Sequence, residues 1–123
     1  ALLVTVATGF SWSSMAIVMP IAFQLAAAYP GGNLISMVAA AVITGAVAGE
    51  HLVPYSEKTV LTAAACGIAP VLHWRTQVGH AVLAAFCAAG GFLLAGLGLP
   101  AGLALLPSFL LLAAVLRWRG ARK

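Results

Sequence analysis

Charged side chains are scarce in this sequence. They account for 7% of the 123 residues, hydrophobic residues account for 63%, and the mean hydropathy is +1.11. Soluble domains carry charge on roughly a quarter of their residues, because a water-facing surface needs polar groups. The shortage excludes an ordinary soluble fold and predicts an all-α, polytopic membrane protein whose first partner is the lipid bilayer. We expect it to lie in the plasma membrane.

Cysteine is nearly absent as well. Cys66 and Cys87 both lie in apolar segments, without the paired Cys/His spacing of zinc sites. We interpret them as two buried free thiols. No nucleophile–base pair is visible either, which argues against an enzyme. The sequence therefore predicts neither catalysis nor a resident metal or cofactor.

Positive charge is present but unevenly placed. The net charge is +4, and four of the six cations lie in the last seven residues, at Arg117, Arg119, Arg122 and Lys123. Such a cluster beside an apolar segment is typical of the cytoplasmic end of a spanning helix, rather than of a nucleic-acid-binding surface. We predict a cytoplasmic basic tail over residues 117–123 and no nucleic-acid partner.

Turn residues divide the apolar sequence into segments of spanning length. An α-helix rises 1.5 Å per residue, so about 20 residues cross the roughly 30 Å hydrocarbon layer. We predict one transmembrane domain over residues 1–123, with a half-helix at 56–67 that is too short to span. The four predicted spans cover residues 1–29, 34–52, 78–97 and 101–118. Because an apolar run begins at Ala1 without signal-peptide features, we expect the C-terminal part of a longer protein.

The first of these segments contains a polar interruption. Gly9 is followed by several hydroxyl side chains up to Ser14. Glycine weakens a helix, and Ser or Thr side chains can satisfy the backbone groups that a break sets free. We predict a break or re-entrant tip near residues 9–14 and a bend at Pro20. The alternative is a continuous helix whose Ser/Thr face packs on a neighbour.

Other local patterns predict contacts and connections between helices. Gly45 and Gly49 lie one helical turn apart and would permit close approach of another helix. Residues 30–33 combine proline, glycine and asparagine, which predicts a loop. The polar cluster His73–Gln77 predicts an interfacial loop or a helix start.

The two acidic residues of the chain, Glu50 and Glu57, both lie in the stretch Gly49–Thr59. Before Trp74 the only other formally charged side chain is Lys58. A charge in hydrocarbon costs several kcal/mol, roughly 2.5–3.5 for an aspartate at a helix centre. Charged side chains are this unfavourable in a membrane, so their grouping around Pro54 indicates a binding site for an ion or a substrate.

Pro54 indicates that this stretch is a junction between two helices. We expect the first helix to end near Leu52 and the second to begin at Ser56, a good N-cap. Glu50 would lie in the last turn of the first helix, where unpaired carbonyls and burial favour the protonated form. Glu57 would lie in the first turn of the second helix, where unpaired N–H groups favour the anion. The carbonyls released at the junction are oxygen donors suited to Na⁺. A proton-accepting group beside oxygens that hold a cation is the minimum for cation/proton exchange.

Lys58 and His51 leave alternatives open. Lys58 could pair with either glutamate and neutralise the site, or it could occupy the place of a metal cation. His51 could relay protons, since an unperturbed histidine has a pKa of about 6.5, or it could be a packed, hydrogen-bonded residue. The whole group could also be an interfacial Glu/Lys cluster that never meets a substrate.

Three motifs, in this order, resemble NhaC-type sodium/proton antiporters, which belong to the broad ion transporter superfamily. Thr8–Trp12 matches the family's Thr-Gly-Thr-Ser-Trp at four positions, and His73–Gln77 matches His-Val-Arg-Thr-Gln at four. Gly49–Thr59 follows Gly-Asp-His-x-Ser-Pro-Ile-Ser-Asp-Thr-Thr, with glutamates in place of both aspartates. The resemblance is to the C-terminal repeat of the family and covers residues 7–77.

This resemblance implies a fold and a function. The fold is one repeat of an inverted-repeat transporter with broken helices, so the N-terminal half of the same transporter is a partner, and a homodimer is compatible with it. The implied function is sodium/proton antiport, with Na⁺ and H⁺ as transported ions. Glu50 would take the proton, while Ser56, Thr59 and Glu57 would hold the cation. The implied ion- and proton-binding residues are Ser11, Ser14, Glu50, His51, Ser56, Glu57 and Thr59, with Lys58 as a modulating residue.

Departures from the family motifs support two further hypotheses. Val53 replaces a serine, Lys58 replaces a threonine, and Leu72 stands where the family often has an aspartate. A secondary transporter of an organic acid or amino acid with the same architecture would use Lys58 to hold a carboxylate. The last alternative is a membrane assembly subunit that transports nothing itself.

Overall fold

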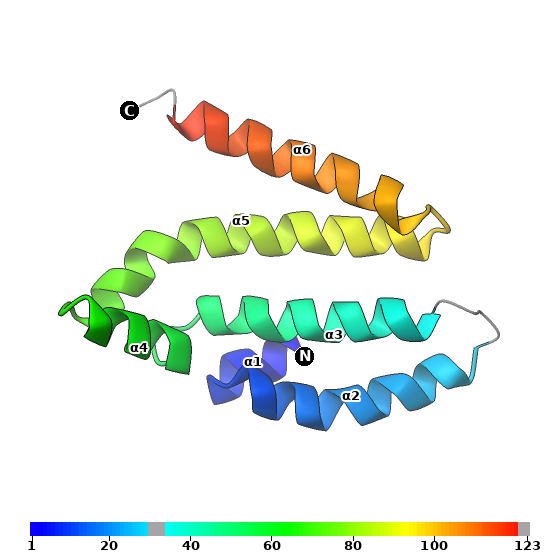
Figure 1. The fold of residues 1–123 in the computed structure, drawn as a ribbon, viewed down its shortest axis with the longest axis horizontal. Helices are drawn as coiled ribbons and strands as arrows, with labels where there is room; N and C mark the ends of the chain where they lie inside the picture. The colour runs from blue at the N-terminus through cyan, green and yellow to red at the C-terminus, as the bar shows by residue number, and fades with distance from the viewer. Residues whose placement is uncertain (30–33, 121–123) are drawn as a thin grey trace. The chain divides into compact units, whose positions relative to one another are not determined.

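The computed structural model describes residues 1–29 and 34–120, whose regular structure is entirely helical (Figure 1). Its helices are α1 (Leu2–Thr8), α2 (Ser11–Ala27), α3 (Leu34–His51), α4 (Glu57–Ala65), α5 (Pro70–Gly96) and α6 (Ala101–Gly120). The all-α prediction is confirmed. Within the described ranges, α3 and α5 are long and apolar enough to cross a membrane. The larger number of four spans and the inverted repeat stay predictions.

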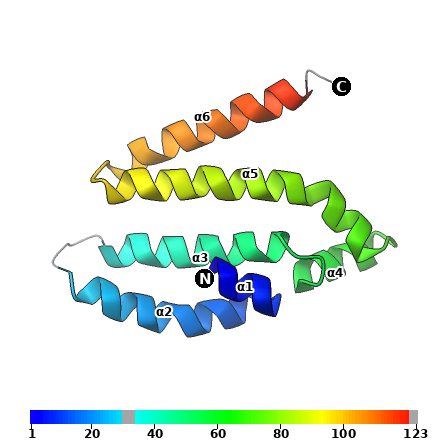
Figure 2. The same cartoon turned by 180° about the vertical axis from the view of Figure 1, so that it is seen from behind.

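The chain divides into two compact units, Ala1–Ala81 and Val82–Lys123. In the first unit α3 packs against α1 and α2, which also contact each other (Figure 2). The side chains buried between these helices are small or polar, with Ala46 and Thr5 both fully buried. Small residues let the helix backbones approach closely, which is the usual basis of helix association in a membrane.

The glycine pair on α3 is the place where α1 approaches most closely. A Cβ atom added to Gly49 would lie 2.7 Å from Cβ of Thr5 and 2.9 Å from the carbonyl oxygen of Leu2. At Gly45 the added atom would lie 3.4 Å from the backbone nitrogen of Leu2. The predicted close helix contact is therefore confirmed, and α1 is the helix that makes it.

The polar interruption of the first segment is a helix break. α1 ends at Thr8, and Gly9 has φ +77°, a left-handed conformation that glycine adopts readily. The N–H of Gly9 donates to the carbonyl of Thr5 at 2.7 Å, Phe10 is extended, and α2 begins at Ser11. The predicted break is confirmed, and α2 then continues through Pro20.

The junction after α3 also forms as the sequence indicates. α3 ends at His51, and α4 begins at Glu57 with Ser56 as its N-cap, whose Oγ accepts a hydrogen bond from the backbone N–H of Thr59 at 3.3 Å. At nine residues, α4 is about 14 Å long and cannot cross a bilayer. It is a half-helix, slightly shorter than the predicted 56–67.

The next helix begins before the predicted span of residues 78–97. α5 begins at Pro70, so the His73–Gln77 cluster lies in its first turns, in agreement with a helix start rather than a loop. Pro70 is well suited to a first helical position, because it lacks the N–H that would be unpaired there and its φ is already helical. Two side chains of this cluster, Trp74 and Gln77, reach the junction from α5.

Two further predictions concern the chain ends and the cysteines. α6 continues past residue 118 to Gly120, so the first part of the predicted basic tail is helical. The predicted loop at residues 30–33 and the last part of the tail, 121–123, lie outside the described residues. Cys87 is buried, but Cys66 is exposed, so the prediction of two buried thiols is wrong for Cys66. It caps the end of the short α4, which buries only Thr59 and Ala63.

Candidate functional site

The buried carboxylate of Glu50 is the centre of the site. Glu50 lies in the last turn of α3 and is 1% exposed. Its Oε1 accepts a hydrogen bond of 2.8 Å from the backbone N–H of Ser11, which is the first residue of α2. The first N–H groups of a helix lack intrahelical partners and carry partial positive charge. The break between α1 and α2 therefore supplies a donor for the carboxylate.

Lys58 provides the second partner of this carboxylate. Its Nζ lies 2.7 Å from Oε2 of Glu50, and its side chain is 46% exposed. Of the alternatives that the sequence left open, the structure has Lys58 paired with Glu50. Helix-end carbonyls and burial alone would favour a protonated Glu50. The ammonium and the Ser11 N–H are two additional groups that compensate a carboxylate charge at this position.

A second polar group surrounds the N-terminus of α4. The Oγ of Ser56 donates to Oγ1 of Thr59 at 2.9 Å, and Thr59 donates in turn to the carbonyl oxygen of Val53 at 3.4 Å. From α5, Nε2 of Gln77 lies 3.5 Å from Oγ1 of Thr59 and 3.5 Å from Nδ1 of His51. Ser56 and Thr59 are both buried. This network joins α3, α4 and α5 around three of the predicted residues.

Carbonyl groups at the junction already have donors. The indole Nε1 of Trp74 donates to the carbonyl of Leu52 at 3.0 Å, and the carbonyl of Val53 accepts from Thr59. Each carbonyl oxygen has a second lone pair, so both remain able to contact a cation. The sequence predicted free carbonyls at this junction. In the structure, these two carbonyls already accept one hydrogen bond each and keep one free lone pair.

The remaining predicted residues are Glu57, Ser14 and Ser11. Glu57 is exposed on α4, and among the described residues it takes part in no ion pair. Ser14 is buried, but its Oγ donates to the carbonyl of Phe10 at 2.9 Å and lies 3.3 Å from Oγ1 of Thr8. Ser14 therefore stabilises the helix break. Ser11 reaches the site through its backbone.

Sequence patterns did not identify several residues of the site. Tyr55 covers the break, since its hydroxyl donates to the carbonyl of Val6 and its ring would lie 3.0 Å from a Cβ at Gly9. Trp74 and Gln77 lie in the polar cluster His73–Gln77, for which the sequence predicts either an interfacial loop or a helix start.

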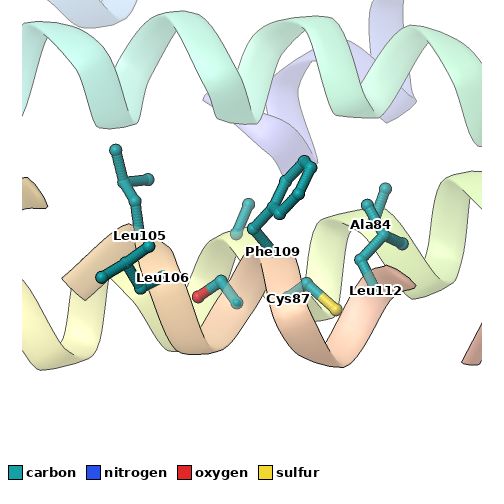
Figure 3. A pocket seen from close by; sticks show the side chains of 8 residues that line it. Ala84, Cys87, Leu105, Leu106, Phe109 and Leu112 are labelled. Atoms are coloured by element: carbon teal, nitrogen blue, oxygen red, sulfur yellow. The ribbon is translucent and has the colours of Figure 1, made fainter. Parts of the chain in front are cut away.

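The described part of the second unit contains an apolar cavity of about 420 Å³, with its side chains shown in Figure 3. Its lining residues are Ala84, Cys87, Ala88, Leu105, Leu106, Ser108, Phe109 and Leu112. No charged side chain is among them, so this cavity offers nothing that would compensate an ion. Glu50 and its neighbours are the better candidate.

Comparison with known proteins found a matching family model and a similar protein. The sequence model of the Na⁺/H⁺ antiporter family matches residues 1–97, which include every residue of the Glu50 site. An uncharacterised protein of Haemophilus influenzae is 34% identical over 90 residues, which make up 72% of this chain. The matched region is 17% of that relative's length, so the chain spans a small part of it. No solved structure matches the chain.

Proposed function

Because the chain belongs to the Na⁺/H⁺ antiporter family, we propose that it is part of a secondary active transporter exchanging Na⁺ for protons across a membrane. The proposal concerns the whole protein, since the chain spans only part of its relative. One observation carries it: a carboxylate that is 1% exposed is paired with a half-exposed ammonium. The structure thus contains a buried anion whose compensating cation is partly exposed.

Exchange follows if Glu50 accepts one cation at a time. Lys58, a proton and Na⁺ can each compensate the carboxylate, and a buried carboxylate without any of them is strongly unfavourable. Proton binding removes the charge that attracts Na⁺, and Na⁺ binding disfavours the proton. Occupancy by one ion therefore lowers the affinity for the other, which couples their movements in opposite directions.

Finer assignments are part of this proposal and rest on the sequence. The order of the three motifs supports membership of the NhaC-type subgroup and a place in its C-terminal repeat. An N-terminal half of the same transporter would then complete the site, and a homodimer is compatible with this arrangement. The basic residues at 117–123 support a plasma-membrane protein whose C-terminus is cytoplasmic. Na⁺ and H⁺ are transported ions, and we propose no enzyme activity and no cofactor.

Transport of an organic anion has less support in this geometry. That alternative needs Lys58 to hold a substrate carboxylate, and the Lys58 ammonium already lies on Glu50. An assembly subunit without transport would leave the ion pair without a role.

Vesicles containing the full-length protein test the proposed exchange. An inward Na⁺ gradient is expected to drive protons out of the vesicles, measured with an internal pH indicator, because both ions compete for one carboxylate. Vesicles without protein are the control. Uptake of a carboxylate solute without any Na⁺-driven proton movement would instead favour the organic-anion transporter.

Replacing Lys58 by threonine is expected to lower the Na⁺ concentration for half-maximal exchange by about tenfold. The reason is that entering Na⁺ would no longer compete with a built-in ammonium. Lys58→Arg keeps a positive charge and is the matched control, expected to retain the original Na⁺ dependence. If Lys58→Thr leaves the Na⁺ dependence unchanged, Lys58 does not act in the site.

A further inference from the structure

Thr5 is a buried polar residue that the proposed exchange at Glu50 does not use. Among the described residues, Oγ1 of Thr5 is a buried side-chain oxygen without a hydrogen-bond partner. Thr5 is 0% exposed, and Oε2 of Glu50 has the Lys58 ammonium beside it. A buried hydroxyl without a partner is unfavourable, because it has given up its hydrogen bonds to water.

The local helix does not explain the unpaired hydroxyl. Thr8 lies on the same helix and makes the usual hydrogen bond to the carbonyl four residues back, that of Val4, at 2.9 Å. Thr5 has the equivalent acceptor in the carbonyl of Ala1, which receives the backbone N–H of Thr5 at 2.9 Å. The hydroxyl of Thr5 nevertheless makes no such bond.

Packing against α3 places Thr5 on Gly49, the residue that precedes Glu50. A Cβ atom at Gly49 would lie 2.7 Å from Cβ and 3.1 Å from Cγ2 of Thr5. Gly49 directly precedes Glu50, so the unpaired oxygen of Thr5 belongs to a residue that packs on the turn of α3 carrying Glu50. Cβ and Cγ2 of Thr5 make this contact, whereas its hydroxyl oxygen has no hydrogen-bond partner.

We propose that Thr5 is a ligand of the transported monovalent cation, sharing it with the carboxylate of Glu50. This inference rests on the proposed function and adds to it the residue that recognises the ion. A neutral hydroxyl oxygen and a carboxylate are hard donors, which suit a small alkali cation that has lost part of its hydration shell. The ion would supply the partner that the Thr5 hydroxyl lacks and would take the place of the Lys58 ammonium at Oε2 of Glu50.

Two substitutions at Thr5 separate a ligand from a packing residue. Thr5→Val keeps the branched shape against Gly49 and removes the hydroxyl, whereas Thr5→Ser keeps the hydroxyl and removes the methyl group. In vesicles, Thr5→Val is expected to raise the Na⁺ concentration for half-maximal exchange by about tenfold. A change of this size corresponds to the loss of one contact about as strong as a hydrogen bond. Thr5→Ser is expected to stay within about threefold of the original value.

Thermal unfolding in detergent adds a measurement that does not depend on transport. Thr5→Val is expected to unfold at the same or a higher temperature in choline chloride, because an unfavourable buried hydroxyl is gone. It is also expected to lose the stabilisation by NaCl that the unsubstituted protein shows, since a ligand stabilises the state that binds it. Thr5→Ser should show the opposite pattern, with lower stability but a retained NaCl effect.

Failure of this inference differs from failure of the proposed function. If exchange works and Thr5→Val keeps both the Na⁺ dependence and the NaCl stabilisation, the hydroxyl holds a buried water or nothing, and the ligand role is overturned. Absence of exchange together with loss of NaCl stabilisation in Thr5→Val would overturn antiport and support the ligand role. Absence of both exchange and any NaCl effect in the unsubstituted protein would overturn both.

Discussion

Replacing Glu50 by glutamine is expected to reduce Na⁺-driven proton movement in vesicles to the level of vesicles without protein. Glutamine has nearly the same shape, and its amide oxygen can still accept the hydrogen bond from the Ser11 N–H, which is 2.8 Å long in the structure. It can neither take up a proton nor carry the charge that attracts Na⁺. The loss would therefore come from the chemistry of the carboxylate and not from altered packing.

Glu57→Gln is the matched control for this result. Glu57 is the other acidic residue of the chain, it lies seven positions further on, and it is exposed on α4. Because the Lys58 ammonium is paired with Glu50, we expect Glu57→Gln to retain exchange. Equal loss in both variants would favour the sequence hypothesis, in which Glu57 also holds the cation. Unchanged exchange in Glu50→Gln would contradict the proposed mechanism and favour the assembly subunit.

Replacing Gly49 by alanine is expected to lower the free energy of unfolding by about 1–3 kcal/mol, the usual range for overpacking a tight contact. The added Cβ would lie 2.7 Å from Cβ of Thr5 and 2.9 Å from the backbone carbonyl oxygen of Leu2. Since one of these neighbours is backbone, the contact can be relieved only by moving α1 away from α3. The unfolding temperature in detergent measures the effect.

Gly90→Ala provides the comparison for Gly49→Ala. Gly90 also lies inside a helix, α5, and a Cβ atom there would meet nothing within 4 Å. Alanine is favoured over glycine in a helix by roughly 1 kcal/mol, so this variant should be as stable as the original or slightly more stable. If both alanine variants have the same unfolding temperature, the close contact between α1 and α3 is not present in the membrane protein.

Local signals in the sequence were sufficient for the class of protein and for most helix limits. The shortage of charge predicted a membrane protein, and the glycine at position 9 predicted the break that the structure has there. Ser56 was predicted as an N-cap, and its Oγ accepts from the backbone N–H of Thr59. These features depend on a few consecutive residues, so they can be predicted without knowing the fold. Pro70 shows the limit of such signals, because proline is compatible with both a helix end and a helix start.

The partners of Glu50 were decided by the tertiary structure. The sequence located the carboxylate and placed Lys58 near it, but it left the choice between Glu50 and Glu57 open. That choice depends on how α4 returns toward α3, and the Ser11 N–H comes from a position 39 residues away. The unpaired hydroxyl of Thr5 likewise appears only when α1 packs on Gly49. By itself, then, the sequence determined that an acidic junction lies in a broken-helix membrane protein, because helix ends and charge are local properties. Only the close packing of α1, α2 and α3 determined which groups surround the carboxylate, because those contacts join residues far apart in the chain.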